Sequence, residues 1–144
     1  MELFRNLEIS ATALTAERLR MDLISDNIAN ANTTRTKEGG PYQRKVPVFA
    51  EVLDESISRN SGRLISKPAG VKVLQIQPDG KPPRLVYDPS HPDANADGYV
   101  AYPDINPVVE MVNLISASRS YEANITAFNT SKEMFRAALD LARS

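Results

Sequence analysis

Two long stretches without glycine or proline, one near each end of the 144-residue chain, most constrain how it can fold. The first includes Phe4 to Ala31, and the second follows Pro107 to the last residue. Because glycine and proline weaken or break helices, stretches without them favour long helices. Nine of the ten prolines and all six glycines lie between Asn32 and Pro103. The pattern predicts two terminal helices that bracket a turn-rich segment.

Both terminal stretches carry apolar residues at the seven-residue spacing of coiled-coil helices. If the chain returns on itself, the two helices pair antiparallel. We expect helix packing or assembly through the following residues: Leu7, Leu14, Met21, Ile28, Met111, Leu114, Tyr121, Ile125, Phe128, Phe135 and Leu139. The partner positions of the first seam include Ile24 and Ala31. A hairpin closed within one chain stays an alternative, but polar seam positions such as Glu17 and Lys132 favour a larger bundle in which register or partner choice is specified.

The ends of the two helices can also be read from the sequence. Asn30, Asn32 and Thr33 are poor helix formers, and asparagine tolerates the backbone conformation that closes helices. Asn106 is a natural N-cap, and Pro107 after it suits the first helical position.

The segment between the helices contains short runs rich in β-branched, aliphatic and aromatic residues. They predict strands around residues 42–49, 71–77 and 84–87. The fold class is therefore α+β, with a small β-rich insert between long helices. We divide the chain into an N-terminal helix at 1–34, a β-rich outer segment at 35–103 and a C-terminal helix at 104–144, the two helices forming one core.

Composition excludes several classes of function. A net charge of -1 provides no basic surface for nucleic acid or anionic lipid. The chain has no cysteine, which excludes disulfides and thiolate chemistry. Charged residues such as Glu8 and Arg18 interrupt the N-terminal apolar pattern, so neither a signal-peptide core nor a membrane span is predicted.

No motif for catalysis or for a cofactor is present in the sequence. The single histidine, His91, lies between Ser90 and Pro92 and has no second histidine for a metal site. The glycines form neither a dinucleotide-binding motif nor a phosphate-binding loop. We therefore expect a protein that is not an enzyme and holds no cofactor.

One acidic loop has the spacing of a calcium-binding loop. Asp93, Asn95 and Asp97 occupy positions 1, 3 and 5 of an EF-hand-type loop, and Gly98 occupies position 6. Position 12 is Asp104, which is shorter than the usual glutamate, and prolines on both sides disfavour the helices that the motif requires. The favoured interpretation is a turn before a strand, and a soluble calcium-binding interaction module stays the alternative.

Several segments together carry a resemblance to a known family. They are SDNIANANT at 25–33, LVYDP at 85–89, HPDA at 91–94, DGYV at 97–100, EMVN at 110–113 and ISASRSYEAN at 115–124. The pairing of an N-terminal with a C-terminal signature resembles the axial proteins of the bacterial flagellar rod and hook, and the middle segments resemble the proximal-rod members. The residues of the N-terminal signature are Asn27, Ala29, Asn30, Ala31, Asn32 and Thr33.

The resemblance implies a structural subunit of the proximal rod in the flagellar basal body, which crosses the periplasm. It implies export through the flagellar type III apparatus without a cleaved signal peptide, and helices that pack against neighbouring copies. Such a rod transmits torque from motor to hook and lines the export channel. The implied partners are copies of the chain, other rod subunits, basal-body adaptor and ring proteins, and the export apparatus.

Overall fold

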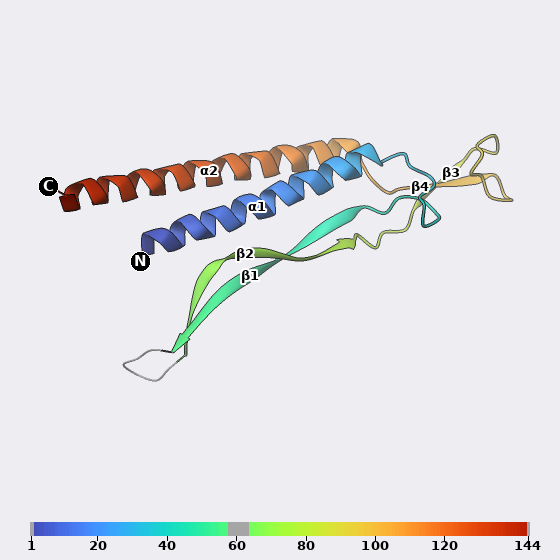
Figure 1. Ribbon diagram of the computed structural model, residues 1–144. Coiled ribbons are helices and arrows are strands. Elements are labelled where there is room, and N and C mark those ends of the chain that lie inside the picture. Colours follow the sequence, from blue (N-terminus) through green and yellow to red (C-terminus); the bar gives the residue numbers. More distant parts are fainter. Residues whose placement is uncertain (1, 58–63, 144) are drawn as a thin grey trace. The chain divides into compact units, whose positions relative to one another are not determined.

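The computed structural model describes residues 2–57 and 64–143, and the side chains of residues 4–54 and 67–141. In chain order the elements are α1 (Glu2–Ala29), β1 (Lys45–Ile57), β2 (Leu64–Pro78), β3 (Arg84–Tyr87), β4 (Tyr99–Tyr102) and α2 (Pro107–Arg143) (Figure 1). β1 pairs with β2 and β3 with β4, in two separate two-stranded sheets. The predicted α+β class, with long terminal helices around a small strand-rich insert, is confirmed.

α1 ends where the asparagine-rich signature predicts. The backbone N–H of Asn30 still donates to the carbonyl oxygen of Asp26 (3.0 Å), and the Asn30 side-chain amide donates to the same oxygen (2.9 Å). The backbone N–H of Thr33 then donates to the carbonyl oxygen of Asn30 (3.0 Å), which turns the chain. The side chain of Asn30 therefore adds a second hydrogen bond to a carbonyl group of the last helical turn.

The predicted N-cap of α2 is confirmed. The side-chain oxygen of Asn106 accepts hydrogen bonds from the backbone N–H groups of Val108 (3.0 Å) and Val109 (3.4 Å). These N–H groups belong to the first turn, which has no helical acceptors. Pro107 fills the first helical position, where its missing N–H costs nothing.

The strands lie where the sequence predicts them, but two of them are longer than predicted. β1 begins at Lys45, three residues after the predicted start, and both β1 and β2 extend well beyond the predicted runs. β3 has the predicted bounds and pairs antiparallel with β4, with Tyr87 opposite Tyr99. Gly98 precedes β4 with a φ of +79°, a conformation that strongly favours glycine, so the turn expected there is present.

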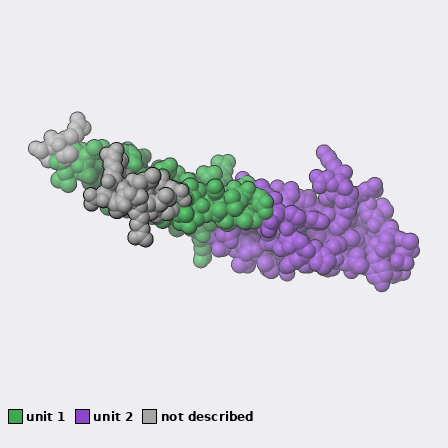
Figure 2. All heavy atoms as spheres, turned by 90° about the horizontal axis from the view of Figure 1, so that it is seen from below, with its two compact units in different colours: residues 1–19, 48–75, 117–144 green, residues 20–47, 76–116 purple. Residues whose placement is uncertain are grey.

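The chain forms two compact units, drawn in different colours in Figure 2. The first unit contains residues 1–19, 48–75 and 117–144, and the second unit contains residues 20–47 and 76–116. Each unit therefore takes part of both helices. The division into an inner helical core and an outer segment concerns an assembled rod and stays a proposal.

α1 and α2 run antiparallel within the units. In the first unit the rings of Phe4 and Phe135 meet edge to face, with centroids 4.8 Å apart. In the second unit the side chains of Asn27 and Glu110 meet, so residues later in α1 contact residues earlier in α2. Neither helix of the described chain is long and apolar enough to cross a membrane.

The buried positions of the helices only partly follow the predicted heptad seam. Ile24 and Ala31, partner positions of that seam, are buried in the second unit. In α2 the buried residues are Glu110 and Ala117, which lie one position before Met111 and Ser118. One row of the predicted seam, which contains Leu114 and Tyr121, is half-buried, whereas in the other row burial lies one residue earlier than predicted, at Glu110 and Ala117.

Candidate functional site: a buried polar network and exposed helix faces

Asn27 is the most buried polar residue of the described chain, with 1% of its surface exposed. Its side-chain amide donates to the carbonyl oxygen of Lys45 (2.9 Å), and its Oδ1 accepts from the backbone N–H of Lys45 (2.9 Å). The hydroxyl of Tyr42 also donates to Oδ1 (3.1 Å). Asn27 therefore acts as a partner for the first residue of β1, in the way that a neighbouring strand would.

Glu110 brings a carboxylate into the same buried region, with only 2% of the residue exposed. Its Oε1 accepts from Nη2 (2.8 Å) and Nε (3.0 Å) of Arg44 and from the amide of Asn113 (3.3 Å). Its Oε2 lies 3.5 Å from the amide nitrogen of Asn27. A buried carboxylate is tolerated because it is paired and hydrogen-bonded, so these contacts are a condition for burying it.

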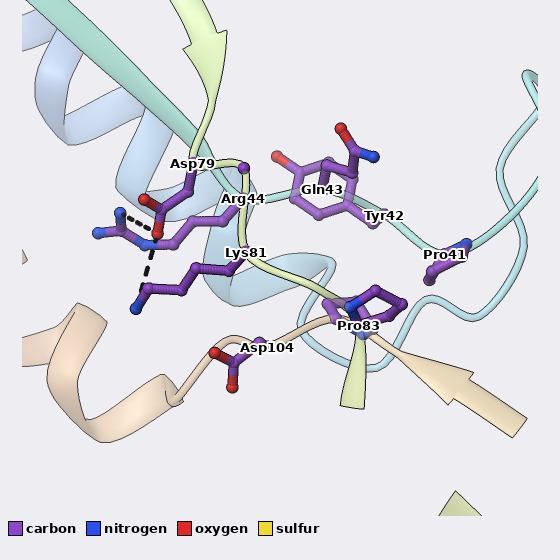
Figure 3. A pocket seen from close by; sticks show the side chains of 10 residues that line it. Pro41, Tyr42, Gln43, Arg44, Asp79, Lys81, Pro83 and Asp104 are labelled. Carbon is purple, nitrogen blue, oxygen red and sulfur yellow. Dashed lines mark hydrogen bonds and ion pairs between the residues drawn. The ribbon is translucent and has the colours of Figure 1, made fainter. Parts of the chain in front are cut away.

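Arg44 continues the network toward the end of β2. Its Nη1 lies 3.3 Å from Oδ2 of Asp79, and Nζ of Lys81 lies 3.8 Å from the same oxygen. Figure 3 shows the Asp79 carboxylate between these two cations. The backbone N–H of Asp79 also donates to the carbonyl oxygen of Arg44 (2.8 Å). Arg44 thereby connects α2, the start of β1 and the end of β2.

A small pocket of about 110 Å³ opens beside this network (Figure 3). Pro41, Pro83 and Pro103 form part of its wall, together with the ring of Tyr42 and the carboxylate of Asp104. Its volume is well below the roughly 300–1,000 Å³ of sites for small-molecule ligands. The pocket therefore gives no support to an enzymatic active site.

Tyr42 joins the network through its phenol hydroxyl, whose ionisation depends on its surroundings. Burial of the phenol raises its pKa above the ordinary value of 10.0, and the negative charge of Asp26 raises it further. Both effects disfavour the phenolate and keep the hydroxyl able to donate to Asn27.

The structure assigns different environments to the six residues of the predicted signature. Asn27 and Ala31 are buried, Asn30 and Thr33 are half-buried, and Ala29 and Asn32 are exposed. The Thr33 hydroxyl donates to Oδ1 of Asn30 (3.2 Å), so Asn30 and Thr33 shape the turn while Asn27 binds β1. Sequence reasoning missed the partners of Asn27, because Tyr42, Lys45 and Glu110 are distant in sequence and carry no local motif.

In the acidic loop predicted as a turn, the side-chain oxygens of Asp93 and Asn95 have partners within the protein. Asp93 accepts from the hydroxyl of Thr34 (2.8 Å) and lies 3.7 Å from Nη1 of Arg35. Oδ1 of Asn95 accepts from the backbone N–H groups of Asp97 (3.0 Å) and Tyr99 (2.9 Å). Among the described side chains, no cluster of three or more His, Asp or Glu residues is suited to hold a metal ion. These contacts support the structural interpretation of the loop.

None of the predicted seam residues is fully buried in the isolated chain. Half-buried are Leu7, Leu14, Met21, Ile28, Leu114, Tyr121, Phe128 and Phe135, whereas Met111, Ile125 and Leu139 are exposed. Phe135 packs on Phe4, but most of these side chains keep surface that another subunit can cover. Their role in assembly stays a prediction.

Two family models match the two ends of the chain. The model described as "Flagella basal body rod protein" matches residues 7–37, which contain most of α1 and the asparagine signature. The model described as "Flagellar basal body rod FlgEFG protein C-terminal" matches residues 96–141, which contain β4 and nearly all of α2. The matches therefore cover most of each helix, together with the residues that follow α1 and the residues that precede α2.

Similar full-length proteins are known from distant bacteria. The chain is 45% identical to the flagellar basal-body rod protein FlgC of Borreliella burgdorferi, over 96% of this chain and 97% of that protein. It is 45% identical to FlgC of Bacillus subtilis, over 99% and 100% of the two chains, and 41% identical to FlgC of Aquifex aeolicus, over 94% and 93%. The chain belongs to the FlgC family of flagellar basal-body rod proteins, which are structural components of the rod rather than enzymes.

Proposed function

We propose that this chain is a proximal-rod subunit whose two helices pack against neighbouring subunits to build the wall of a torque-transmitting tube. Further contacts with copies of itself, other rod subunits, and adaptor and ring proteins hold it in the basal body. The inner surface of the wall lines the channel through which later flagellar subunits pass. The chain itself reaches the rod unfolded, through the flagellar export apparatus.

The observation that carries this proposal is the uncovered apolar surface of the helices. Large apolar side chains along α2 remain exposed in the isolated chain, including Val108, Val112 and Leu139, and Phe4 is exposed on α1. Exposed apolar surface of this extent marks an interaction site in a soluble protein. A tube that carries torque requires many equivalent helix contacts between successive subunits, and these helices supply apolar faces for them.

The proposal is tested by placing a carboxylate in the predicted seam. Leu14→Asp, expressed in cells that lack their own copy of the subunit, is expected to abolish rod assembly and swimming because it buries a charge between helices. Ala11→Asp is the matched control, since Ala11 is exposed on the same helix and the new carboxylate stays in water. Swimming in soft agar, immunoblots and electron microscopy of isolated basal bodies provide the readouts. Normal motility of Leu14→Asp cells at normal protein levels would contradict the role of the seam.

Torque transmission is tested separately with a milder change. Leu14→Ala removes apolar contacts without adding charge, so rods are expected to assemble with weaker contacts between subunits. Cells with such rods should swim in dilute medium and lose flagella in viscous medium, where the load on the rod is higher. Equal retention of flagella by the variant and the parent under load would argue against a torque-bearing role for this contact.

A further inference from the structure

A groove of about 290 Å³ lies between α1 and β2 in the first unit. One wall is a stripe of α1 residues at helical spacing, and the other wall is a short run of β2. The lining residues are Thr12, Thr15, Ala16, Leu19, Val71, Lys72 and Val73. Apart from one lysine and two threonine hydroxyls, the lining is aliphatic, so the groove suits apolar side chains of a partner.

The groove is built by a close approach of β2 to α1. The backbone N–H of Val71 donates to Oγ1 of Thr12 (3.2 Å), and Gly70 lies so near that an added Cβ would collide with the Thr12 side chain. Beyond this contact the small side chain of Ala16 leaves space that neither element fills. The two walls are therefore in contact at Thr12 and Gly70, and they are separated next to this contact, where the groove lies.

The chain also carries an uncovered apolar ridge, on the first turns of α2 in the second unit. Its members are Val108, Met111, Val112 and Ile115, which follow the spacing of one helix face. Val108 is 64% exposed, Val112 61% and Ile115 56%. The opposite face of the same turns contains the buried residues Glu110 and Ala117, so nothing in the described chain covers the ridge.

The ridge and the groove match in length, in chemistry and in charge. Thr12 to Leu19 and Val108 to Ile115 are eight residues each, so the first and last residue of each stretch lie about 10.5 Å apart along the helix. Lys72 lines the groove, and Asp104 precedes the ridge; neither makes an ion pair within the part of the chain that the structure describes. A lysine on one surface and an aspartate on the other favour their association and fix its direction.

We infer that the ridge of one copy, Val108 to Ile115, docks in the α1–β2 groove of the next copy, with Asp104 directed toward Lys72. This inference rests on the proposed function and names one of its subunit contacts. Because ridge and groove are different surfaces, the contact is heterologous: each copy offers its ridge to one neighbour and its groove to another. Such a contact repeats from copy to copy, around a ring or along a helical row.

The absence of cysteine makes disulfide crosslinking a direct test. Thr15→Cys and Val112→Cys are combined in one chain, which is expressed in cells that lack their own copy and then oxidised. In a docked pair the Cα atoms of positions 15 and 112 of neighbouring copies lie within the roughly 4.4–6.8 Å that a disulfide spans. Oxidation is therefore expected to give a ladder of crosslinked copies. In the matched control, Ala96→Cys replaces Val112→Cys at an exposed turn, and the ladder is expected to be lost.

A second measurement identifies the occupant of the groove and includes a check that the variant still folds. A photoreactive residue in place of Thr15 should crosslink to peptides around Val112 of another copy, identified by mass spectrometry. Val112→Asp should weaken this crosslink about tenfold or more, because the carboxylate would be buried. The circular dichroism of that variant should equal that of the parent, since Val112 is exposed in the single chain. Capture of a different protein at Thr15, or of none, overturns the inference.

Failure of this inference and failure of the proposed function are distinguishable. If the parent chain is absent from isolated basal bodies, the proposed function fails. If the chain is present there and the cysteine variant swims, but no crosslink between positions 15 and 112 forms on oxidation, only the ridge and groove contact fails.

Discussion

The second unit buries hydrogen-bonded polar side chains, whereas in the first unit the described contacts between elements are an aromatic edge contact, a close steric approach and a hydrogen bond at Thr12. In the second unit, Asn27 and Glu110 are almost fully buried, and each has several directional partners. In the first unit, an edge contact between Phe4 and Phe135 and the close approach of Gly70 to Thr12 join the elements. Apolar surface stays uncovered in both units, at Phe4 in the first and at Val108 in the second. Directional bonds specify one arrangement within the chain, while uncovered apolar surface needs a partner to complete it.

The largest effect on stability is expected when the buried carboxylate of the second unit is removed. Glu110→Ala leaves Arg44 without its main partner, and breaking a buried ion pair costs about 3–5 kcal/mol. The free energy of unfolding, measured by urea denaturation of the purified chain, should fall by that amount. Glu122→Ala, an exposed carboxylate of the same helix, is the control and should change it by less than about 0.5 kcal/mol. A loss for Glu110→Ala as small as the control would show that the network is not essential to the unit.

Removal of Asn27 tests the link between α1 and β1. Asn27→Ala leaves the N–H and carbonyl groups of Lys45 without their partner, at a cost of about 2 kcal/mol for two part-buried backbone groups. Hydrogen exchange should then increase at the start of β1 more than elsewhere. Asn32→Ala is the control within the same signature, since Asn32 is exposed. Equal protection of Lys45 in the variant and the parent would contradict this role.

The steric contact of the first unit is tested at Gly70. Gly70 has a φ of +136°, and a Cβ there would collide with Thr12, so Gly70→Ala should cost about 2 kcal/mol. Gly40→Ala separates strain from collision, because Gly40 also has a positive φ but open space around it. In the double variant Thr12→Ala, Gly70→Ala, the part caused by the collision should be recovered. Equal unfolding energies for the two single variants would remove the collision from the explanation.

The smallest expected effect is a dependence on alkaline pH in the second unit. The raised pKa of Tyr42 means that the folded chain holds the phenol proton more tightly than the unfolded chain. This contribution to stability is complete below the unfolded pKa of about 10 and is lost as pH rises through the raised folded value. Tyr42→Phe should therefore lose less stability than the parent between about pH 8 and about pH 11. Tyr87→Phe, at an exposed tyrosine, should behave as the parent does.

Local signals predicted much of the fold. The end of α1, the Asn106 cap and the bounds of β3 depend on neighbouring residues, which the sequence presents together. The heptad seam identified the helices and one row of the covered face of α2, but not the most buried positions, Glu110 and Ala117. At one of those positions lies Glu110, whose partner Arg44 directly precedes β1 and is distant in sequence. A period of seven indicates an apolar face, but the partners in space decide which positions are covered.

The order of segments in the two units also has a consequence for folding. The second unit is complete once residue 116 is available, whereas the first unit requires residues 117–144 as well as the beginning of the chain. Closing a loop between distant segments costs conformational entropy, and contacts between the segments can offset this cost only when both segments are present. A chain that emerges from its N-terminus, from the ribosome or from an export channel, can therefore fold the second unit while the N-terminal part of α1 still has no helical partner. The first unit, which contains the groove, then forms last, when the whole chain has emerged.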